Sequence, residues 1–319
     1  MNKNFALIGC GGYVAPKHMK AITDTGNNLI AALDRNDSVG ILDSFSYDTA
    51  FFTEFERFDR HAEKLRRRGE QDRIHYVSIC SPNYLHDAHI RFALRIGADA
   101  ICEKPLVLNP WNLDALQELE NETGQTVYNI LQLRLHPAIL ELKNKIETGN
   151  RQEKHKIDLS YITSRGRWYF VSWKGDVEKS GGVATNIGIH FFDMLLWIFG
   201  SLQHQEVHLS EANKMAGYIE LEHAEVRWFL SVDSDDLPEE AKRKNSPTWR
   251  SITVDGEEVE FSGGFTDLHT KVYEGILAGQ GHGIEAACPS LELVSDVRNM
   301  KVLSSNNSRV HPFVSRIKT

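Results

Sequence analysis

The chain has 319 residues, of which 41% are hydrophobic and 25% charged, and its formal net charge is −8. This length suits two domains better than one minimal core. The negative charge argues against nucleic acid or a membrane surface as a partner, because both are anionic. No segment approaches the roughly 20 apolar residues of a membrane-spanning helix. The first apolar run is also too short for a secretory signal, so we expect a cytoplasmic protein.

The cysteines show no C-x-x-C spacing, and three of the four fall at the ends of expected buried strands. They are Cys10, Cys80, Cys102 and Cys288. This pattern is typical of small core residues in a reducing compartment. No metal site is predicted.

In the first half of the chain, nearly continuous apolar runs alternate with helical patterns. Strands are expected at 5–9, 29–34, near 51, 76–80, 100–103 and 127–133, with helices at about 15–25, up to 68, after 86 and at 110–122. Apolar strands that alternate with helices predict a doubly wound parallel sheet covered on both faces, which makes the fold class α/β. We expect this Rossmann domain to span residues 1–125.

The second half changes to segments in which polar and apolar residues alternate. They lie at 156–162, 206–210, 217–233 and 250–261, with helices at 189–199 and 266–278. Period-two alternation predicts a large, open, mainly antiparallel sheet, and Asp255-Gly256 is typical of a type I′ hairpin turn. An α+β domain for substrate binding and oligomerisation is therefore expected over 126–303. The polar tail, 304–319, is expected to be frayed.

The first strand runs into a glycine turn. Gly9, Gly11 and Gly12 would let the backbone approach a pyrophosphate, and Tyr13 and Val14 lead into the following helix. Asp34 ends the second strand, where an acid binds the ribose 2′-hydroxyl and repels a 2′-phosphate. A tight turn without a ligand would contain the same glycines, but the position of Asp34 favours NAD. The neighbouring Arg35 leaves NADP as an alternative.

The third apolar strand is followed by Ser81-Pro82-Asn83, at the sheet edge where open α/β sheets bind ligands. These residues could contact ribose or phosphate. His86 lies one helical turn further, and by itself it fits a surface or capping residue as well as a cofactor contact.

Glu103-Lys104-Pro105 completes a recognisable pattern together with Asn186-Ile187-Gly188-Ile189-His190. With the glycine turn, Asp34 and the Pro-Asn…His segment, it resembles the glucose–fructose oxidoreductase/inositol dehydrogenase family over about 4–200. Two features depart from that family. The glycine turn is one residue longer, and Asn186 stands where many members carry Asp, so a proton relay through that position is in doubt.

Several longer segments are similar to bacterial UDP-N-acetylglucosaminuronate 3-dehydrogenases of surface-polysaccharide synthesis. They lie at 11–18, 78–86, 129–139, 161–169, 172–176, 183–190 and 250–258. The likeness implies NAD-dependent oxidation of the 3-hydroxyl of a UDP-sugar for lipopolysaccharide O-antigen or a related polymer. It also implies a homodimer or homotetramer, and it leaves open whether NADH is reoxidised in place by a 2-oxo acid.

Oxidation of a secondary alcohol needs a group that takes the hydroxyl proton. His190, with an ordinary pKa near 6.5, suits this acid/base role, and Lys104 could bind and polarise the hydroxyl. The two roles could be exchanged. Pro105 would fix the chain so that Lys104 projects from the strand end, and a cis bond is one way to do so.

A second group of residues combines cations with aromatic rings, which suits a diphosphate and a flat base. We expect Arg165, Tyr169, Lys174 and Asn186 to bind substrate. The resemblance places Glu103, Lys104, Trp168 and Tyr169 at the cofactor, and Gln132, at a strand end, could reach it too. By strand alternation Arg134 and His136 would share the face of Gln132. Rival interpretations are oxidation of another sugar or inositol and, less favoured, a non-catalytic NAD sensor.

Overall fold

A computed structural model describes residues 2–149, 153–260, 263–304 and 308–317. The chain forms two compact units, the first of Met1–Gln132 with Thr266–Cys288 and the second of Leu133–Phe265 with Pro289–Thr319. This division differs from the expected boundary at residue 125, because the chain returns to the first unit near residue 266. Local sequence periodicity carries no signal for such a return.

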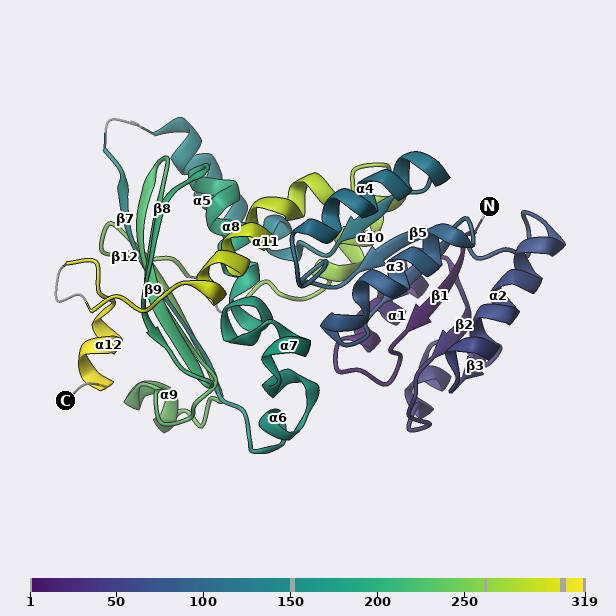
Figure 1. The fold of residues 1–319 in the computed structure, drawn as a ribbon, viewed down its shortest axis with the longest axis horizontal. Coiled ribbons are helices and arrows are strands. Elements are labelled where there is room, and N and C mark those ends of the chain that lie inside the picture. The colour runs from purple at the N-terminus through teal and green to yellow at the C-terminus, as the bar shows by residue number, and fades with distance from the viewer. Residues whose placement is uncertain (1, 150–152, 261–262, 305–307, 318–319) are drawn as a thin grey trace. The chain divides into compact units, whose positions relative to one another are not determined.

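The first unit contains the expected parallel sheet (Figure 1). Its strands are β1 (Asn4–Ile8), β2 (Asn28–Leu33), β3 (Ala50–Phe52), β4 (Tyr76–Ile79), β5 (Asp99–Cys102) and β6 (Val127–Asn129). Their order, β3-β2-β1-β4-β5-β6, is that of the dinucleotide-binding Rossmann fold, and every pair is parallel. The order reverses between β1 and β4, and ligands bind at the carboxyl ends of the strands at such a point.

Helices cover this sheet. α1 (Ala15–Asp24) lies beside α10 (Leu268–Leu277), and Tyr273 of α10 stacks on Phe5 of β1 with ring centroids 5.9 Å apart. Phe58 and Phe92 join α2 (Phe55–Arg68) to α3 (His86–Arg95), which packs on α4 (Trp111–Thr123). The expected strand at 127–133 ends early, at Asn129, and a 3-10 turn, η3 (Gln132–Leu135), follows.

The second unit is built on a mixed, mainly antiparallel sheet in the order β12-β11-β7-β10-β9-β8. Its strands are β7 (His155–Thr163), β8 (Leu202–Ser210), β9 (Lys214–Leu221), β10 (Ala224–Ser231), β11 (Thr248–Val254) and β12 (Glu257–Glu258). β7 and β10 are parallel neighbours, and the other pairs are antiparallel. Asp255 and Gly256 both have positive φ, 53° and 85°, which confirms the expected type I′ turn.

Neighbouring residues of β10 face opposite sides of this sheet. Trp228 packs edge-on against Phe192 of α8 (Ile189–Phe199), at a centroid distance of 5.3 Å, and α8 contacts α5 (Pro137–Thr148). Phe229 packs on the other side, into a cluster with Ile162 and Val314. Short helices and one longer helix complete the second half of the chain: α6 (Trp168–Val171), α7 (Val177–Ser180), α9 (Glu239–Arg243), α11 (Ile284–Asn299) and α12 (Pro312–Ile317).

The C-terminal segment is ordered from Ser308 to Ile317, so the expectation that the tail is frayed was wrong for these residues. His311 is 2% exposed and its Nε2 lies 3.1 Å from Ser160 Oγ, while Phe313 stacks on Phe229. The segment covers apolar residues that the second sheet face would otherwise expose. Positions 305–307 and 318–319 of the predicted tail lie outside the described residues.

One helical run, Val177–Phe199, is long and apolar enough to cross a membrane by length and composition alone. The expectation that no segment approaches such a helix was therefore wrong for this run. Of its most apolar window, 72% is buried inside the protein. Core helices of globular units pass the same test, so this run is weak support for a membrane span.

Substitution Val314→Asp should destabilise the second unit by about 3 kcal/mol, because it buries a carboxylate without a partner. Val314 is 1% exposed. Urea unfolding followed by circular dichroism measures the change. Leu303→Asp, at a position 46% exposed, is the matched control and should cost less than about 0.5 kcal/mol. Equal losses in the two variants would contradict the packing described for the tail.

Candidate functional site

The glycine turn at the end of β1 is tightly constrained. Gly9 has φ 87°, and a Cβ there would lie 2.7 Å from the carbonyl carbon of Cys80. The amide of Gly12 donates to the carbonyl of Gly9 at 3.0 Å. Side chains are therefore excluded where the first strand turns into α1, as a pyrophosphate-binding turn requires.

Asp34 follows β2 and lies against this turn. Its Oδ2 accepts from the amide of Gly11, and its Oδ1 accepts from the amide of Asn36, both at 2.9 Å. Gly11 and Tyr13 are exposed, Tyr13 at 94%. A carboxylate that two backbone amides hold in place beside an exposed glycine turn fits the adenosine ribose of NAD.

Buried histidine side chains of the first unit hold the segment after β4 in place. Ser81 Oγ lies 2.8 Å from Nδ1 of the buried His89. His86 is 1% exposed, and its two ring nitrogens lie 2.7 Å from the Pro105 carbonyl and 2.9 Å from the Ser81 carbonyl. The ring thus ties two loops together, and a contact between His86 and the cofactor stays a prediction. Pro82 and the buried Asn83 begin the short turn between them.

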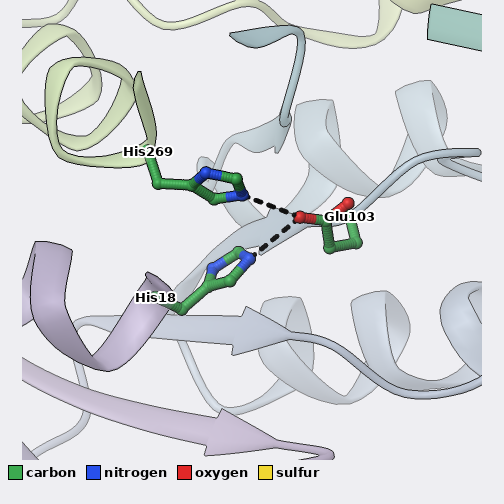
Figure 2. Close-up of side chains that lie close together, drawn as sticks. All are labelled: His18, Glu103 and His269. Carbon is green, nitrogen blue, oxygen red and sulfur yellow. Dashed lines mark hydrogen bonds and ion pairs between the residues drawn. The ribbon is translucent and has the colours of Figure 1, made fainter. Parts of the chain in front are cut away.

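The Lys104–Pro105 peptide bond is cis, as the sequence suggested, and Lys104 is half-buried. Glu103 is buried at 7% exposure. Its Oε1 lies 3.1 Å from Nε2 of both His18 and His269 (Figure 2), and its Oε2 accepts from the Lys104 amide at 3.2 Å. The carboxylate of Glu103 is thus bound within the unit, and a contact between Glu103 and the cofactor stays a prediction.

Burial by itself would raise the pKa of Glu103, but the hydrogen bonds from His18 and His269 more than offset it. The pKa of this carboxyl therefore lies well below its usual range, and the group is ionised. Burial lowers the pKa of His18, so its ring is neutral. Sequence reasoning gave neither histidine a role, because a single histidine in a helical pattern carries no signal of its partner.

In the second unit, Tyr169 and Asn186 are brought together. The amide of Asn186 donates to the Tyr169 hydroxyl at 2.8 Å, and Asn186 lies in a π-helical turn, Ala184–Gly188, which leads into α8. Burial raises the pKa of Tyr169, and the Asn186 hydrogen bond and the charge of Arg165 oppose the shift only in part. The phenol therefore keeps its proton, and it can donate that proton to another acceptor.

The predicted mixture of cations and rings is present beside this pair. Lys174 Nζ lies 4.3 Å from the ring centre of Trp173 and 5.9 Å from that of Trp168. Trp168 is 55% exposed, and Arg165 is exposed as well. An exposed guanidinium and an ammonium next to indole rings can bind an anionic group beside a flat one.

His190 is the second residue of α8 and is half-buried. One turn on, the buried Asp193 accepts two hydrogen bonds from Arg134, at 3.0 and 2.6 Å. The expectation that Arg134 and His136 share the face of Gln132 was wrong, because residues 132–135 form a 3-10 turn. His136 Nε2 instead lies 2.6 Å from the Gly263 carbonyl. Within the described residues, Gln132 Oε1 is buried without a hydrogen-bond partner.

The strand order, the glycine turn and Asp34 define the class of protein as an NAD-binding oxidoreductase of the Rossmann type. Residues 3–130 match an oxidoreductase family with an NAD-binding Rossmann fold, and residues 143–243 match the C-terminal alpha/beta domain of that family. The chain belongs to this oxidoreductase family.

Solved structures provide closer comparisons. The WlbA (WbpB) dehydrogenase from Thermus thermophilus, in complex with NAD and alpha-ketoglutarate, is 50% identical and has a TM-score of 0.94 over 98% of this chain and 99% of that one. The same protein was also solved with NAD and UDP-GlcNAcA. The WlbA dehydrogenase from Bordetella pertussis, at 18% identity and a TM-score of 0.74 over 93% of this chain and 94% of that one, shares the fold.

Curated relatives match over shorter stretches. The alignment spans 29% of the putative oxidoreductase YteT from Bacillus subtilis, at 28% identity over 39% of this chain. It spans 62% of oxidoreductase P35 from Formosa agariphila, at 25% identity over 63% of this chain. The chain thus covers less than two thirds of these relatives, which indicate the oxidoreductase class more than a substrate.

Asp34→Ala should weaken NAD binding by roughly 10- to 100-fold, because a hydrogen bond to a charged group contributes about 1.5–3 kcal/mol. Titration calorimetry with NAD measures the dissociation constant. Asp37→Ala removes an exposed carboxylate three residues further on and should leave the constant unchanged. Equal affinity in Asp34→Ala and the unaltered protein would exclude Asp34 from the cofactor site.

Proposed function

We propose that this protein oxidises the 3-hydroxyl of UDP-N-acetylglucosaminuronic acid to the 3-keto sugar, with NAD as the oxidant. The observation that carries this proposal is 49% identity, at a TM-score of 0.93 and over 98% of the chain, to a dehydrogenase solved with NAD and UDP-GlcNAcA. The product would serve synthesis of lipopolysaccharide O-antigen or a related surface polysaccharide in the cytoplasm.

The first unit would hold the cofactor. The glycine turn would receive the pyrophosphate on the amino end of α1, and the Asp34 carboxylate would accept from the ribose hydroxyls. Ser81, Pro82 and Asn83 lie after β4, at the switch point of the sheet. When bound, NAD would accept the hydride that the carbinol carbon of the sugar loses.

The protein supplies the proton transfer. As the hydride leaves the carbinol carbon, the hydroxyl must lose its proton for the keto group to form. We assign to His190 the role of accepting this proton, and we assign to Lys104 the binding and polarisation of the hydroxyl. An imidazole with a pKa near neutrality can both accept and return a proton. The ammonium of lysine only donates, which suits a group that fixes an oxygen.

Arg165 and Lys174 would bind the diphosphate or the uronate of the substrate. The chain carries a net charge of −8, so an anionic substrate depends on such local cations to overcome the overall repulsion. The hydroxyl of Tyr169, which receives the Asn186 amide, would donate to a sugar oxygen. Trp168 offers an exposed ring to a flat group.

NADH would be reoxidised in place by a 2-oxo acid. The T. thermophilus relative was solved with both NAD and alpha-ketoglutarate, which supports this second half-reaction. A hydride from NADH and a proton would convert the 2-oxo acid into a 2-hydroxy acid and restore NAD. We further propose that the protein acts as a homodimer or homotetramer.

Lys104→Ala and His190→Ala should each lower kcat by about 100-fold or more, because each removes a group that handles the reacting hydroxyl. The rise in absorbance at 340 nm with UDP-N-acetylglucosaminuronic acid and no 2-oxo acid measures the oxidation step, and NAD titration should give nearly unchanged affinity. His223→Ala, which removes a half-buried histidine of the second unit, is the control and should keep full activity. Indifference to both active-site changes would favour an NAD-sensing protein.

A substrate panel tests the sugar. UDP-N-acetylglucosaminuronic acid alone should raise absorbance at 340 nm as NADH forms, and added alpha-ketoglutarate should return it toward the baseline while a 2-hydroxy acid accumulates; myo-inositol and glucose should give no rise. Activity with a free sugar alone would contradict the proposed substrate and favour another alcohol oxidation on the same fold.

Arg165→Ala should raise KM for the nucleotide sugar, because it removes a cation expected to bind an anionic group.

A further inference from the structure

A chain of buried polar side chains surrounds the Glu103 carboxylate. We call it the Glu103 network: His18, Ser78, Glu103, His269 and Tyr273. His18 Nδ1 lies 2.8 Å from the Tyr273 hydroxyl, which lies 2.6 Å from Ser78 Oγ. The members come from α1, β4, the end of β5 and α10, all within the first unit. Figure 2 shows three of them, His18, Glu103 and His269.

The network has one consistent direction of donation. An ionised carboxylate can only accept, so His18 and His269 both donate their Nε2 protons to Oε1. A neutral His18 then accepts at Nδ1 from the Tyr273 hydroxyl, which in turn accepts from Ser78. The second oxygen of Glu103 accepts from the Lys104 amide. The buried charge is thus stabilised by hydrogen bonds to both of its oxygens, as a buried anion requires.

We propose that His18 and His269 are positioning residues for Lys104 in the oxidation assigned above, because through Glu103 they fix the end of β5 against α1 and α10. This inference rests on the proposed function. His18 lies on the helix that follows the glycine turn, so the same carboxylate links the cofactor turn to the lysine. His269 brings in a segment that is distant in sequence, 166 residues from Glu103.

The proposal has a kinetic consequence. A misplacement of about 1 Å at a reacting group can cost 100-fold in rate without loss of the group itself. Loss of a residue that orients a metal ligand typically costs 10- to 100-fold, and we expect a loss of similar size for a residue that orients Lys104. The effect should appear in kcat, because Lys104 is assigned to the reacting hydroxyl, and it should not appear in the affinity for NAD.

Three side chains of this network could also hold a metal ion. His18, Glu103 and His269 place ligand atoms within 4.8 Å of one another, and two histidines with a carboxylate suit Zn²⁺. Hydrogen bonding accounts for the 3.1 Å separations, and the two interpretations make opposite predictions. A metal site predicts a stoichiometric ion, whereas the Glu103 network predicts none.

The test compares two substitutions at one position. His269→Leu removes the donor and should lower kcat 10- to 100-fold, whereas His269→Gln keeps an N–H near the Nε2 position and should recover most of the loss. Tyr273→Phe, which keeps the ring and removes the hydroxyl, should have a smaller effect on kcat. NAD affinity and the unfolding midpoint are measured for each variant.

The matched control is His75→Leu. His75 is also buried in the first unit, at 9% exposure, but its Nδ1 accepts from the Asn4 amide at the amino end of the sheet. It should lower stability without a selective loss of kcat. If His75→Leu and His269→Leu reduce kcat equally, or if His269→Gln is as slow as His269→Leu, the histidine is merely structural and the proposal fails.

A second readout does not need turnover. Trace acetylation of NAD-free protein, followed by mass spectrometry, reports the reactivity of Lys104 relative to Lys174. His269→Leu should change the labelling of Lys104 alone, and His269→Gln should restore it. Inactivity of the unaltered protein on the UDP-sugar would refute the proposed function, whereas unchanged Lys104 labelling would refute the network. Stoichiometric zinc that is lost in His269→Gln would also overturn it in favour of a metal site.

Discussion

The buried carboxylate of Glu103 is the interaction on which the first unit depends. An ionised acid in the interior is costly unless donors surround it, and here two imidazoles and one amide do so. These donors belong to α1, α10 and the residue after Glu103 itself. One charge therefore holds together a helix from the start of the chain, a strand end and a helix from near its end.

In the second unit, the main constraint is that both faces of the sheet must be covered. Its sheet has apolar residues on both faces, and a single layer of helices can cover only one of them. α8 packs on one face through Phe192, and the C-terminal segment covers the other through Val314 and Phe313. Burial of Asp193 with Arg134 anchors α8 to the turn after β6. His190 and Asn186 lie on this anchored helix and on the turn that leads into it.

Local patterns predicted much of the fold. Strand runs, helical periods and the Asp255-Gly256 turn each express a preference of neighbouring residues, and the structure confirms them with small shifts in their ends. The errors arose where a local rule met a tertiary constraint. Strand alternation failed after Asn129, because the chain enters a 3-10 turn, and the polar tail proved ordered because it covers apolar side chains.

The sequence by itself determined the class of protein, through the glycine turn, Asp34 and the Glu103-Lys104-Pro105 motif, since each of these is a short local signal at the end of a strand. Only the tertiary structure decided what the side chains of Glu103 and His86 do. His18 and Tyr273 are 255 residues apart, and Glu103 and His269 are 166 apart. Contacts over such separations leave no periodic trace in the sequence, because folding alone brings their partners together.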